Sequence, residues 1–137
     1  MSEYFVLDCS ITMTWCFEDE FDEYSQYVLQ GLKQFKALVP PLWNFEITNV
    51  LLMAEKRKIL NTADTTRFME LLSSLPIYIS DLNFSNSEII TTARNNNLTS
   101  YDAIYLLLAM RSGNSIATKD KALISACVKN GVFIFLQ

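Results

Sequence analysis

The sequence contains no histidine, and this absence excludes several kinds of chemistry. Without imidazole there can be no Ser-His-Asp or Cys-His nucleophile pair, no histidine acid–base pair for RNA cleavage, and no use of the commonest zinc ligand. If the protein is an enzyme, carboxylates must therefore carry its acid–base or cation-binding chemistry.

Glycine, proline and cysteine are scarce, with three of each among 137 residues. No Gly/Ser-rich linker, low-complexity tract or repeat divides the chain, so we expect a single domain over residues 1–137. The odd cysteine count, without a C-x-x-C pair, favours reduced thiols over a disulfide scaffold. No apolar run approaches the roughly 18 residues that span a bilayer, and the first residues carry no positive segment. We therefore expect a cytoplasmic protein that does not enter a membrane.

Basic residues are outnumbered, because 11 Lys and Arg face 15 Asp and Glu, for a net charge of −4. The chain thus lacks the general basic surface by which many proteins bind nucleic acid. A polyanion would need a local patch or a bridging cation. The candidate patches are 56–58 (Lys-Arg-Lys) and the pair Lys119 and Lys121, which are otherwise ordinary solvated positions.

Short apolar runs alternate with segments of helical periodicity. We expect strands at 4–7, 77–79, 115–118 and 132–136, and helices near 18–32, 43–59, 64–75, 85–96, 99–111 and 120–129. Ser85 and Glu88 have the spacing of a capping box. Strands separated by helices require crossover connections, so the sequence predicts a three-layer α/β/α sandwich with a mainly parallel central sheet.

Four acidic residues occur in apolar surroundings. Asp8 ends the first strand, Glu46 lies within an apolar helix, Asp102 precedes a run of apolar residues, and Asp120 follows a strand. Asp8 and Asp120 should meet at the carboxyl edge of a parallel sheet, where ligands bind in such folds. Helical spacing places Glu46 with Asn49, Val50 and Met53, and Asp102 with Tyr105, Leu106 and Ala109, on faces expected to point inward.

Carboxylates gathered without cations repel one another and raise one another's pKa unless a divalent cation lies between them. An all-oxygen site suits Mg²⁺ or Mn²⁺. Each acid also has a purely structural interpretation. Asp102 and Asp120 are placed to complement helix N-termini, and Glu46 to benefit from a helix dipole. Asp8 is harder to explain in this way, because an unpaired charge at the end of a buried strand is costly.

The blocks that contain these acids resemble a known family. The blocks are Val6-Leu7-Asp8-Cys9-Ser10, Pro41-Leu42 leading to Glu46 and Asn49-Val50-Leu51, Leu98-Thr99-Ser100-Tyr101-Asp102-Ala103, and Ala117-Thr118-Lys119-Asp120-Lys121. Together they look like a PIN domain, and within that superfamily they are similar to VapC-type toxins of toxin–antitoxin modules. The likeness covers essentially the whole chain.

The resemblance implies a Mg²⁺- or Mn²⁺-dependent endoribonuclease that is inhibited by a cognate antitoxin and is often a homodimer. It maps the acidic quartet onto Asp8, Glu46, Asp102 and Asp120, and the supporting hydroxyls onto Ser10 and Thr118. Asp8, Asp102 and Asp120 would hold the metal, and Glu46 would hold or orient a water. Cleavage by water predicts products with 5′-phosphate and 3′-hydroxyl ends.

Other functions remain open at this stage. A phosphatase of the haloacid-dehalogenase type needs a second Asp two residues after the first, and Ser10 stands there. A phosphoacceptor receiver domain needs paired acids after strand one and a central acceptor, for which Asp81 is the available residue. A non-catalytic protein-interaction module is the main alternative. Trp43, Phe45, Phe68 and Met69 are candidates for docking an antitoxin helix or a second protomer, with core packing as their other role.

Overall fold

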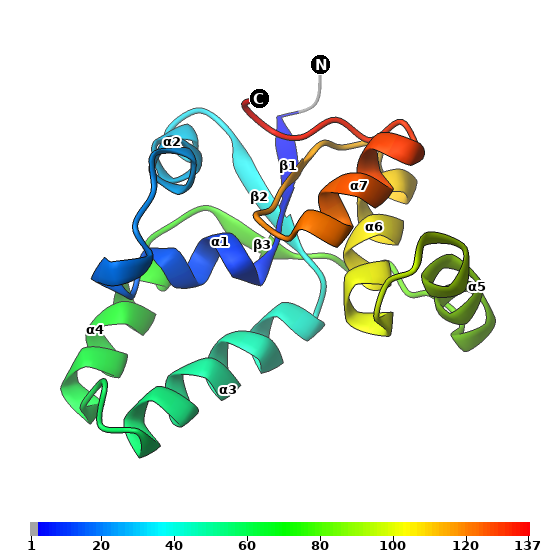
Figure 1. Cartoon of the computed structure of the whole chain (residues 1–137). Coiled ribbons are helices and arrows are strands. Elements are labelled where there is room, and N and C mark those ends of the chain that lie inside the picture. Colours follow the sequence, from blue (N-terminus) through cyan, green and yellow to red (C-terminus); the bar gives the residue numbers. More distant parts are fainter. Residues whose placement is uncertain (1–2) are drawn as a thin grey trace.

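The computed structural model describes residues 3–137 and consists of helices around a parallel sheet (Figure 1). Within these residues the sheet has four strands in the order β3-β2-β1-β4. They are β1 (Tyr4–Leu7), β2 (Lys36–Val39), β3 (Ile77–Ile79) and β4 (Ile116–Ala117). All three pairings are parallel, so the chain must cross over between neighbouring strands, and helices make these crossings.

The helices cover both faces of the sheet. They are α1 (Cys9–Thr14), the 3₁₀ helix η1 (Glu18–Glu20), α2 (Glu23–Gly31), α3 (Leu42–Lys56), α4 (Thr62–Ser73), α5 (Asn86–Asn96), α6 (Ser100–Ser112) and α7 (Lys121–Lys129). In Figure 1, α1 and α2 lie on one side of the sheet, α5, α6 and α7 lie on the other, and α3 and α4 lie below α1. The predicted α/β/α sandwich is therefore confirmed. No helix among residues 3–137 is both long and apolar enough to cross a membrane.

The core centres on β1 and α6. Phe5, Val6 and Leu7 of β1 are completely buried, which is expected for a parallel strand covered on both faces. Helix α6 is buried from Ala103 to Ala109 apart from the half-buried Ile104, since it packs against β1 as well as its neighbouring helices. A helix that is apolar around most of its circumference belongs in such an interior position.

Local capping signals fix where α5 and α6 begin. Ser85 and Glu88 form the predicted capping box at the start of α5. The Asp102 backbone N–H donates to the Thr99 side chain at 3.1 Å, which fixes the start of α6. Helix α6 ends at Gly113, whose φ of 71° is a left-handed conformation that glycine adopts without strain.

Three local expectations differ from the structure. Segment 132–136 was expected to be a strand, but it makes only an isolated parallel bridge, from Ile134 to Ile116, and Leu136 turns the chain away with φ of 60°. Strand β2 was not predicted, because its short apolar run merges into Pro40-Pro41. Helix α1 was not predicted either, since six residues are too few to show a helical period.

Candidate functional site

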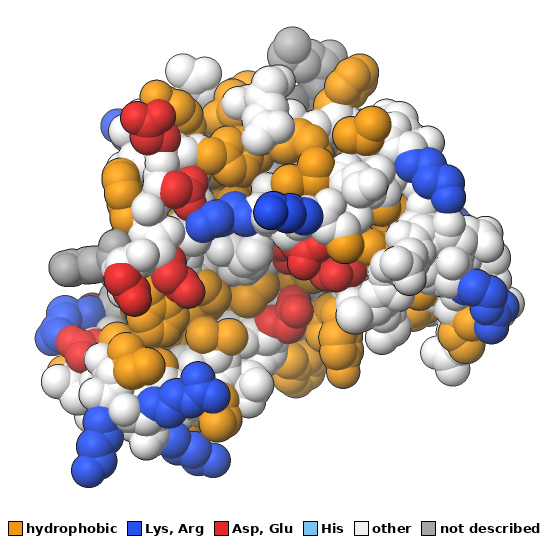
Figure 2. All heavy atoms as spheres, viewed as in Figure 1, with side chains coloured by type: hydrophobic (Ala, Val, Ile, Leu, Met, Phe, Trp, Pro, Cys, Tyr) orange, Lys and Arg blue, Asp and Glu red, His pale blue; other side chains and the backbone are white. Residues whose placement is uncertain are grey.

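The candidate site lies where the chain leaves the carboxyl ends of β1 and β4. Because β1 lies between β2 and β4, the chain turns to opposite sides after neighbouring strands, and this switch point is where α/β sheets bind ligands. The register pairs Leu7 with Ala117, and the Asp8 backbone N–H donates to the Ala117 carbonyl at 3.0 Å. Asp8 and Thr118 are therefore neighbours. Figure 2 shows acidic side chains gathered in the middle of one face, next to basic side chains.

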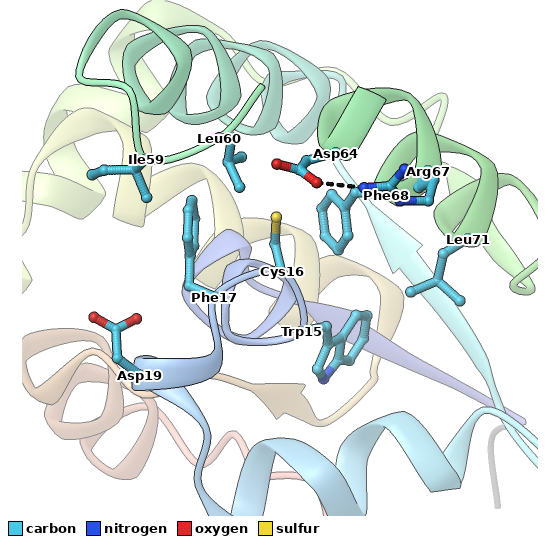
Figure 3. Close-up of a pocket in the computed structure, with 10 residues that line it drawn as sticks. All are labelled: Trp15, Cys16, Phe17, Asp19, Ile59, Leu60, Asp64, Arg67, Phe68 and Leu71. Carbon is cyan, nitrogen blue, oxygen red and sulfur yellow. Dashed lines mark hydrogen bonds and ion pairs between the residues drawn. The ribbon is translucent and has the colours of Figure 1, made fainter. Parts of the chain in front are cut away.

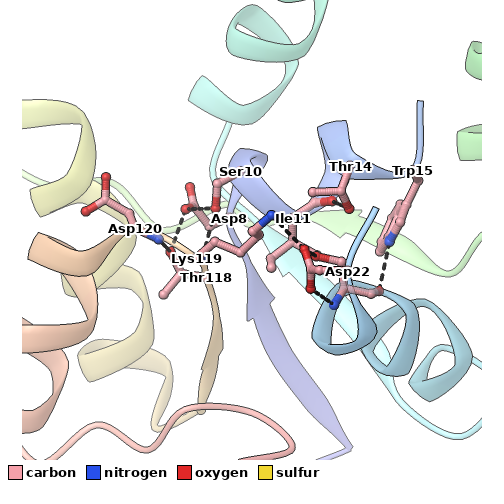
Figure 4. A network of polar contacts seen from close by, with 10 residues as sticks. Asp8, Ser10, Ile11, Thr14, Trp15, Asp22, Thr118, Lys119 and Asp120 are labelled. Carbon is pink, nitrogen blue, oxygen red and sulfur yellow. Dashed lines mark hydrogen bonds and ion pairs between the residues drawn. The ribbon is translucent and has the colours of Figure 1, made fainter. Parts of the chain in front are cut away.

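Asp8 is held by two hydroxyls (Figure 4). Ser10 Oγ and Thr118 Oγ1 each donate to Asp8 Oδ2 at 2.7 Å. Asp8 is buried, with 5% of the residue exposed. Ser10 Oγ in turn accepts from the Lys119 backbone N–H at 3.2 Å, and Thr118 Oγ1 accepts from the Asp120 N–H at 3.1 Å. This network ties the turn after β1 to the turn after β4.

Burial dominates the electrostatics of Asp8. Desolvation raises the pKa of this carboxyl above its ordinary value, the hydroxyls of Ser10 and Thr118 lower it, and the charge of Asp120 raises it again. Hydrogen bonds to the charged form thus only partly offset the burial penalty. Asp8 is a buried carboxylate whose charge would be stabilised by an added cation.

Asp102 and Asp120 stand at two helix starts near Asp8. Asp102 lies in the first turn of α6, and burial, followed by repulsion from Asp120 and Asp8, raises its pKa to about 6. Asp120 is the N-cap of α7, where Oδ1 accepts from the Leu123 N–H at 2.9 Å. The capping interpretation of Asp120 is therefore correct for one oxygen.

Glu46 belongs to the second turn of α3, since the helix begins at Leu42 and its first turn contains no acid. The helix-dipole interpretation of Glu46 is therefore wrong. The face expected to point inward is also only partly buried: Glu46 and Val50 are half-buried, whereas Asn49 and Met53 are exposed. The fully buried stripe of α3 consists of Trp43, Ile47, Leu51 and Ala54. Glu46 thus lies at the margin of the core.

A hydrogen bond from α6 fixes Glu46. Tyr105 Oη donates to Glu46 Oε1 at 2.6 Å, and this bond joins residues 59 positions apart in the sequence. Burial raises the pKa of Glu46, the Tyr105 hydroxyl lowers it, and the charges of Asp8 and Asp102 raise it further. The sequence places Tyr105 on the face of Asp102 but does not reveal this contact with Glu46. An i, i+3 spacing from Asp102 was the available signal.

The four acids form one electrostatic cluster, because the pKa of Asp8, of Glu46 and of Asp102 is raised in each case by the charge of at least one other member. Their donors are the oxygen ligands that Mg²⁺ and Mn²⁺ prefer. Within residues 3–137, however, no group of three or more acidic or cysteine side chains is arranged to hold a metal ion as it stands. The donor chemistry fits a divalent cation, and binding one requires these side chains to move closer together.

The predicted basic residues differ in their placement. Lys119 Nζ forms an ion pair with Asp22 at 2.6 Å, and Asp22 also caps α2 by accepting from the Ser25 N–H (Figure 4). Lys121 is exposed in the first turn of α7, next to Asp120. The segment 56–58 lies at the opposite end of α3 from Glu46, about 15 Å along the helix axis. Lys119 and Lys121 are thus the basic residues beside the acids, and Asp22 is a contact that the sequence did not reveal.

Two cavities flank this region. One, of about 660 Å³, adjoins the cluster and is lined by Ser10, Lys119 and Asp120 together with Asp19, Glu20 and Phe21. The other, of about 630 Å³, lies between α1, η1 and α4. Figure 3 shows Trp15, Phe17 and Phe68 around it, with the Asp64–Arg67 ion pair at its rim. The first cavity is rich in acids and the second is rich in aromatic side chains.

The candidate docking residues separate into two kinds. Trp43 and Phe68 are 6% exposed and pack in the core, where Trp43 Nε1 also donates to Thr12 Oγ1 at 3.1 Å. Phe45 and Met69 are exposed. Asp81, the candidate phosphoacceptor, is exposed after the edge strand β3, and β2 separates that strand from β1.

Comparison with known proteins bears on the fold. No family model matches the chain, and no curated protein matches its sequence. Among solved structures, the chain is similar to PAE2754 from Pyrobaculum aerophilum, with a TM-score of 0.68 and 23% identity over 91% of this chain and 79% of that chain. The chain therefore shares its α/β sandwich fold with that protein.

Proposed function

We propose that the protein is a Mg²⁺- or Mn²⁺-dependent endoribonuclease that acts as the toxin of a toxin–antitoxin pair. The supporting observation is the cluster of Asp8, Glu46, Asp102 and Asp120 at the switch point of the sheet. Burial and mutual repulsion raise the pKa of three of these carboxyls. Acids whose pKa values are raised by burial and by the charges of their neighbours are typical of functional sites.

Asp8, Asp102 and Asp120 are the residues that would hold the cation. A divalent ion there polarises a phosphodiester and makes water more acidic. The chain supports this arrangement through Ser10 and Thr118, which fix one oxygen of Asp8. Since Asp120 Oδ1 accepts the hydrogen bond that caps α7, Oδ2 is the oxygen available to a ligand.

Glu46 would orient the attacking water, because the Tyr105 hydroxyl holds its carboxylate and the other three acids are assigned to the cation. With water as the nucleophile, neither histidine nor attack by the RNA 2′-hydroxyl is required. In-line displacement of the 3′-oxygen then leaves 5′-phosphate and 3′-hydroxyl ends.

The charges around the cluster restrict how RNA would approach. Asp19 and Glu20 line the adjoining cavity and would repel phosphates, while Lys119 and Lys121 lie beside Asp120. Lys119 is paired with Asp22, so that its charge is partly neutralised. RNA binding therefore depends on the cation and on these two lysines, and we expect it to be weak in the presence of a chelator.

The proposal includes a cognate antitoxin, a homodimer and a cytoplasmic location. Exposed apolar side chains such as Phe45 and Met69 support a protein partner or a second protomer, since interfaces favour aromatic residues and methionine.

A protein-interaction module without catalysis is the second candidate. Its specific support is the cavity in Figure 3, whose lining is largely aromatic and aliphatic. The capping role of Asp120 is a further point in its favour, because it gives this acid a structural purpose. These two functions differ in whether the acids react or only stabilise helices.

The deciding experiment incubates labelled structured and single-stranded RNAs with the protein, with Asp8→Asn and with Asp81→Asn, all purified identically. Asp81 is exposed and outside the cluster, so its variant is the matched control. We expect Mn²⁺-dependent cleavage with 5′-phosphate ends for the wild type and Asp81→Asn, and none for Asp8→Asn or with chelator. Equal cleavage by all three would indicate a contaminant, and no cleavage of any RNA would favour the interaction module.

A further inference from the structure

The contact between Tyr105 and Glu46 joins the middle of α6 to the second turn of α3. Tyr105 is completely buried, and its hydroxyl donates to Glu46 Oε1 at 2.6 Å. Tyr105 lies one helical turn after Asp102, so the same helix supplies an acid of the cluster and a donor to another acid. Two helices that are distant in sequence are thus coupled through the site.

The two partners of this bond differ in flexibility. The Tyr105 ring has two side-chain torsions and is fixed by packing in the core, whereas a half-buried glutamate loses considerably more side-chain freedom when it is held in one position. Burial and the charges of Glu46 and Asp8 raise the pKa of the Tyr105 phenol, so that it remains a donor. A rigid donor therefore holds a flexible acceptor.

We propose that Tyr105 is a positioning residue, whose buried hydroxyl holds the Glu46 carboxylate within the acidic cluster near Asp8 and Asp102. This inference rests on the proposed function for its effect on catalysis. Residues that orient a metal-site carboxylate commonly alter activity or metal affinity by about 10- to 100-fold when they are changed. Removing the Tyr105 hydroxyl should have an effect in this range.

A purely structural explanation is that a buried tyrosine hydroxyl needs an acceptor, and Glu46 supplies one. The two explanations differ in how mutations combine. If Tyr105 acts through Glu46, its hydroxyl loses its effect on the site once the Glu46 carboxylate is gone. If it only stabilises the fold, the effects of the two mutations on activity are independent or absent.

The test uses Tyr105→Phe, Glu46→Gln, the double variant and Thr65→Val. Thr65 Oγ1 donates to Glu55 Oε2 at 2.6 Å, so Thr65→Val removes a hydroxyl–glutamate bond of the same length to α3, away from the acidic cluster. Measurements are RNA cleavage with Mn²⁺ resolved into kcat and KM, Mn²⁺ affinity by calorimetry, and thermal unfolding. All kinetics are taken where circular dichroism shows each variant folded. Tyr105→Met replaces Tyr105→Phe if the latter does not fold.

We expect Tyr105→Phe to lower kcat or Mn²⁺ affinity by about 10-fold or more, to leave KM for RNA nearly unchanged, and to have no further effect in the Glu46→Gln background. Thr65→Val should match the wild type in kcat and in Mn²⁺ affinity. A folded Tyr105→Phe with wild-type kcat and Mn²⁺ affinity, or losses that add to those of Glu46→Gln, would overturn the proposal. If the wild type binds Mn²⁺ but cuts no RNA, the proposed function fails, and the Mn²⁺ affinities of the variants alone decide whether Tyr105 positions Glu46. If the wild type neither binds Mn²⁺ nor cuts RNA, the proposed function and the positioning role of Tyr105 are both overturned.

Discussion

The protein places its carboxylates in two contrasting settings. One set forms ion pairs with cations at the surface: Glu3 with Lys36, Asp22 with Lys119, Asp64 with Arg67, and Glu88 with Arg111. The other set is the cluster of Asp8, Glu46, Asp102 and Asp120. Within residues 3–137, none of the ion pairs includes a member of the cluster.

The difference shows that the Lys and Arg side chains in ion pairs do not neutralise the acids whose charged forms are most disfavoured by burial and repulsion. Asp22, paired with Lys119, has a lowered pKa: burial raises it, but the hydrogen bonds from Lys119 and Ser25 and the charge of Lys119 together outweigh that penalty. Asp8 and Asp102 have raised pKa values for the opposite reason. Pairing with Lys119 thus favours the charged form of Asp22, whereas burial and repulsion disfavour the charged forms of Asp8 and Asp102.

Asp120 belongs to the cluster and also caps α7, so its two roles can be separated by mutation. Asn caps a helix about as well as Asp, whereas Ala does not. We expect Asp120→Asn to be at least as stable as the wild type, because it keeps the cap and removes a charge that repels Asp8 and Asp102, but to lose RNA cleavage by about 100-fold or more. Asp120→Ala should lose cleavage equally and be about 1 kcal/mol less stable than Asp120→Asn. Urea unfolding and cleavage assays on both variants measure this, and an active Asp120→Asn would contradict a direct role in the site.

Removing the hydroxyl of Thr118 should have the next largest effect, which is a loss of stability. Thr118→Val keeps the side-chain shape but leaves the buried Asp8 Oδ2 with one hydroxyl donor and the Asp120 N–H without its acceptor. We expect a loss of about 1–3 kcal/mol in the free energy of unfolding at neutral pH. Thr48→Val is the control, since its exposed hydroxyl bonds only carbonyls of its own helix. Equal stabilities of the two variants would count against this account of Asp8.

Burial of Asp102, together with repulsion from Asp120 and Asp8, predicts a dependence of stability on pH. The pKa of Asp102 in the fold, about 6, exceeds its ordinary value of 3.8, so the folded state binds the proton more tightly. This contribution to the free energy of unfolding is therefore full at low pH and is lost as the pH rises from about 4 to about 6.

In chelator, we accordingly expect Asp102→Asn to melt above the wild type at pH 7.5, with the difference shrinking towards pH 4.5. Added Mn²⁺ should raise the melting temperature of the wild type more than that of the variant. Thermal unfolding at several pH values measures both effects. A variant less stable than the wild type at pH 7.5 would show that Asp102 is a stabilising acid like those of the paired set.

The smallest effect should come from the paired set itself. Arg67→Gln removes the ion pair with Asp64, in which the Arg67 side chain is 67% exposed. We expect a change below about 1 kcal/mol in unfolding free energy, reduced further by salt, and no change in RNA cleavage. Denaturant unfolding at low and high salt provides the measurement, and a large change would mean that the surface pairs stabilise more than their exposure suggests.

The sequence was sufficient to predict the α/β/α architecture, because the patterns that indicate its helices and strands depend on neighbouring residues. The apolar run before Asp8, the capping boxes and the alternation of strands with helices are all set by neighbouring residues. The parallel sheet follows from the connections alone. Elements of four to six residues, such as β2 and α1, have too few positions to show a period, and 132–136 has strand composition without strand pairing.

The site was predictable only as a set of residue types. Buried context identified the four acids, since charges next to apolar runs are conspicuous. The resemblance pointed to Thr118 as a supporting hydroxyl, but the residue sequence alone did not give the bonds from Thr118 to Asp8 and from Tyr105 to Glu46, because these join positions 110 and 59 residues apart. The position of Glu46 in the second turn of α3 was also missed, because the helix begins one residue earlier than expected.

The hydrogen bond between Thr118 and Asp8 also orders events during synthesis. The ribosome makes Asp8 first, and at about 5–20 residues per second the segment that carries Thr118 follows roughly 5–20 s later. Strand β4 then has to pair with the edge of β1, which closes a loop of 110 residues, before Thr118 and Asp120 can lie beside Asp8. The cluster is thus incomplete until residues 116–120 have been made and β4 has paired with β1, and the proposed nuclease activity would begin only then.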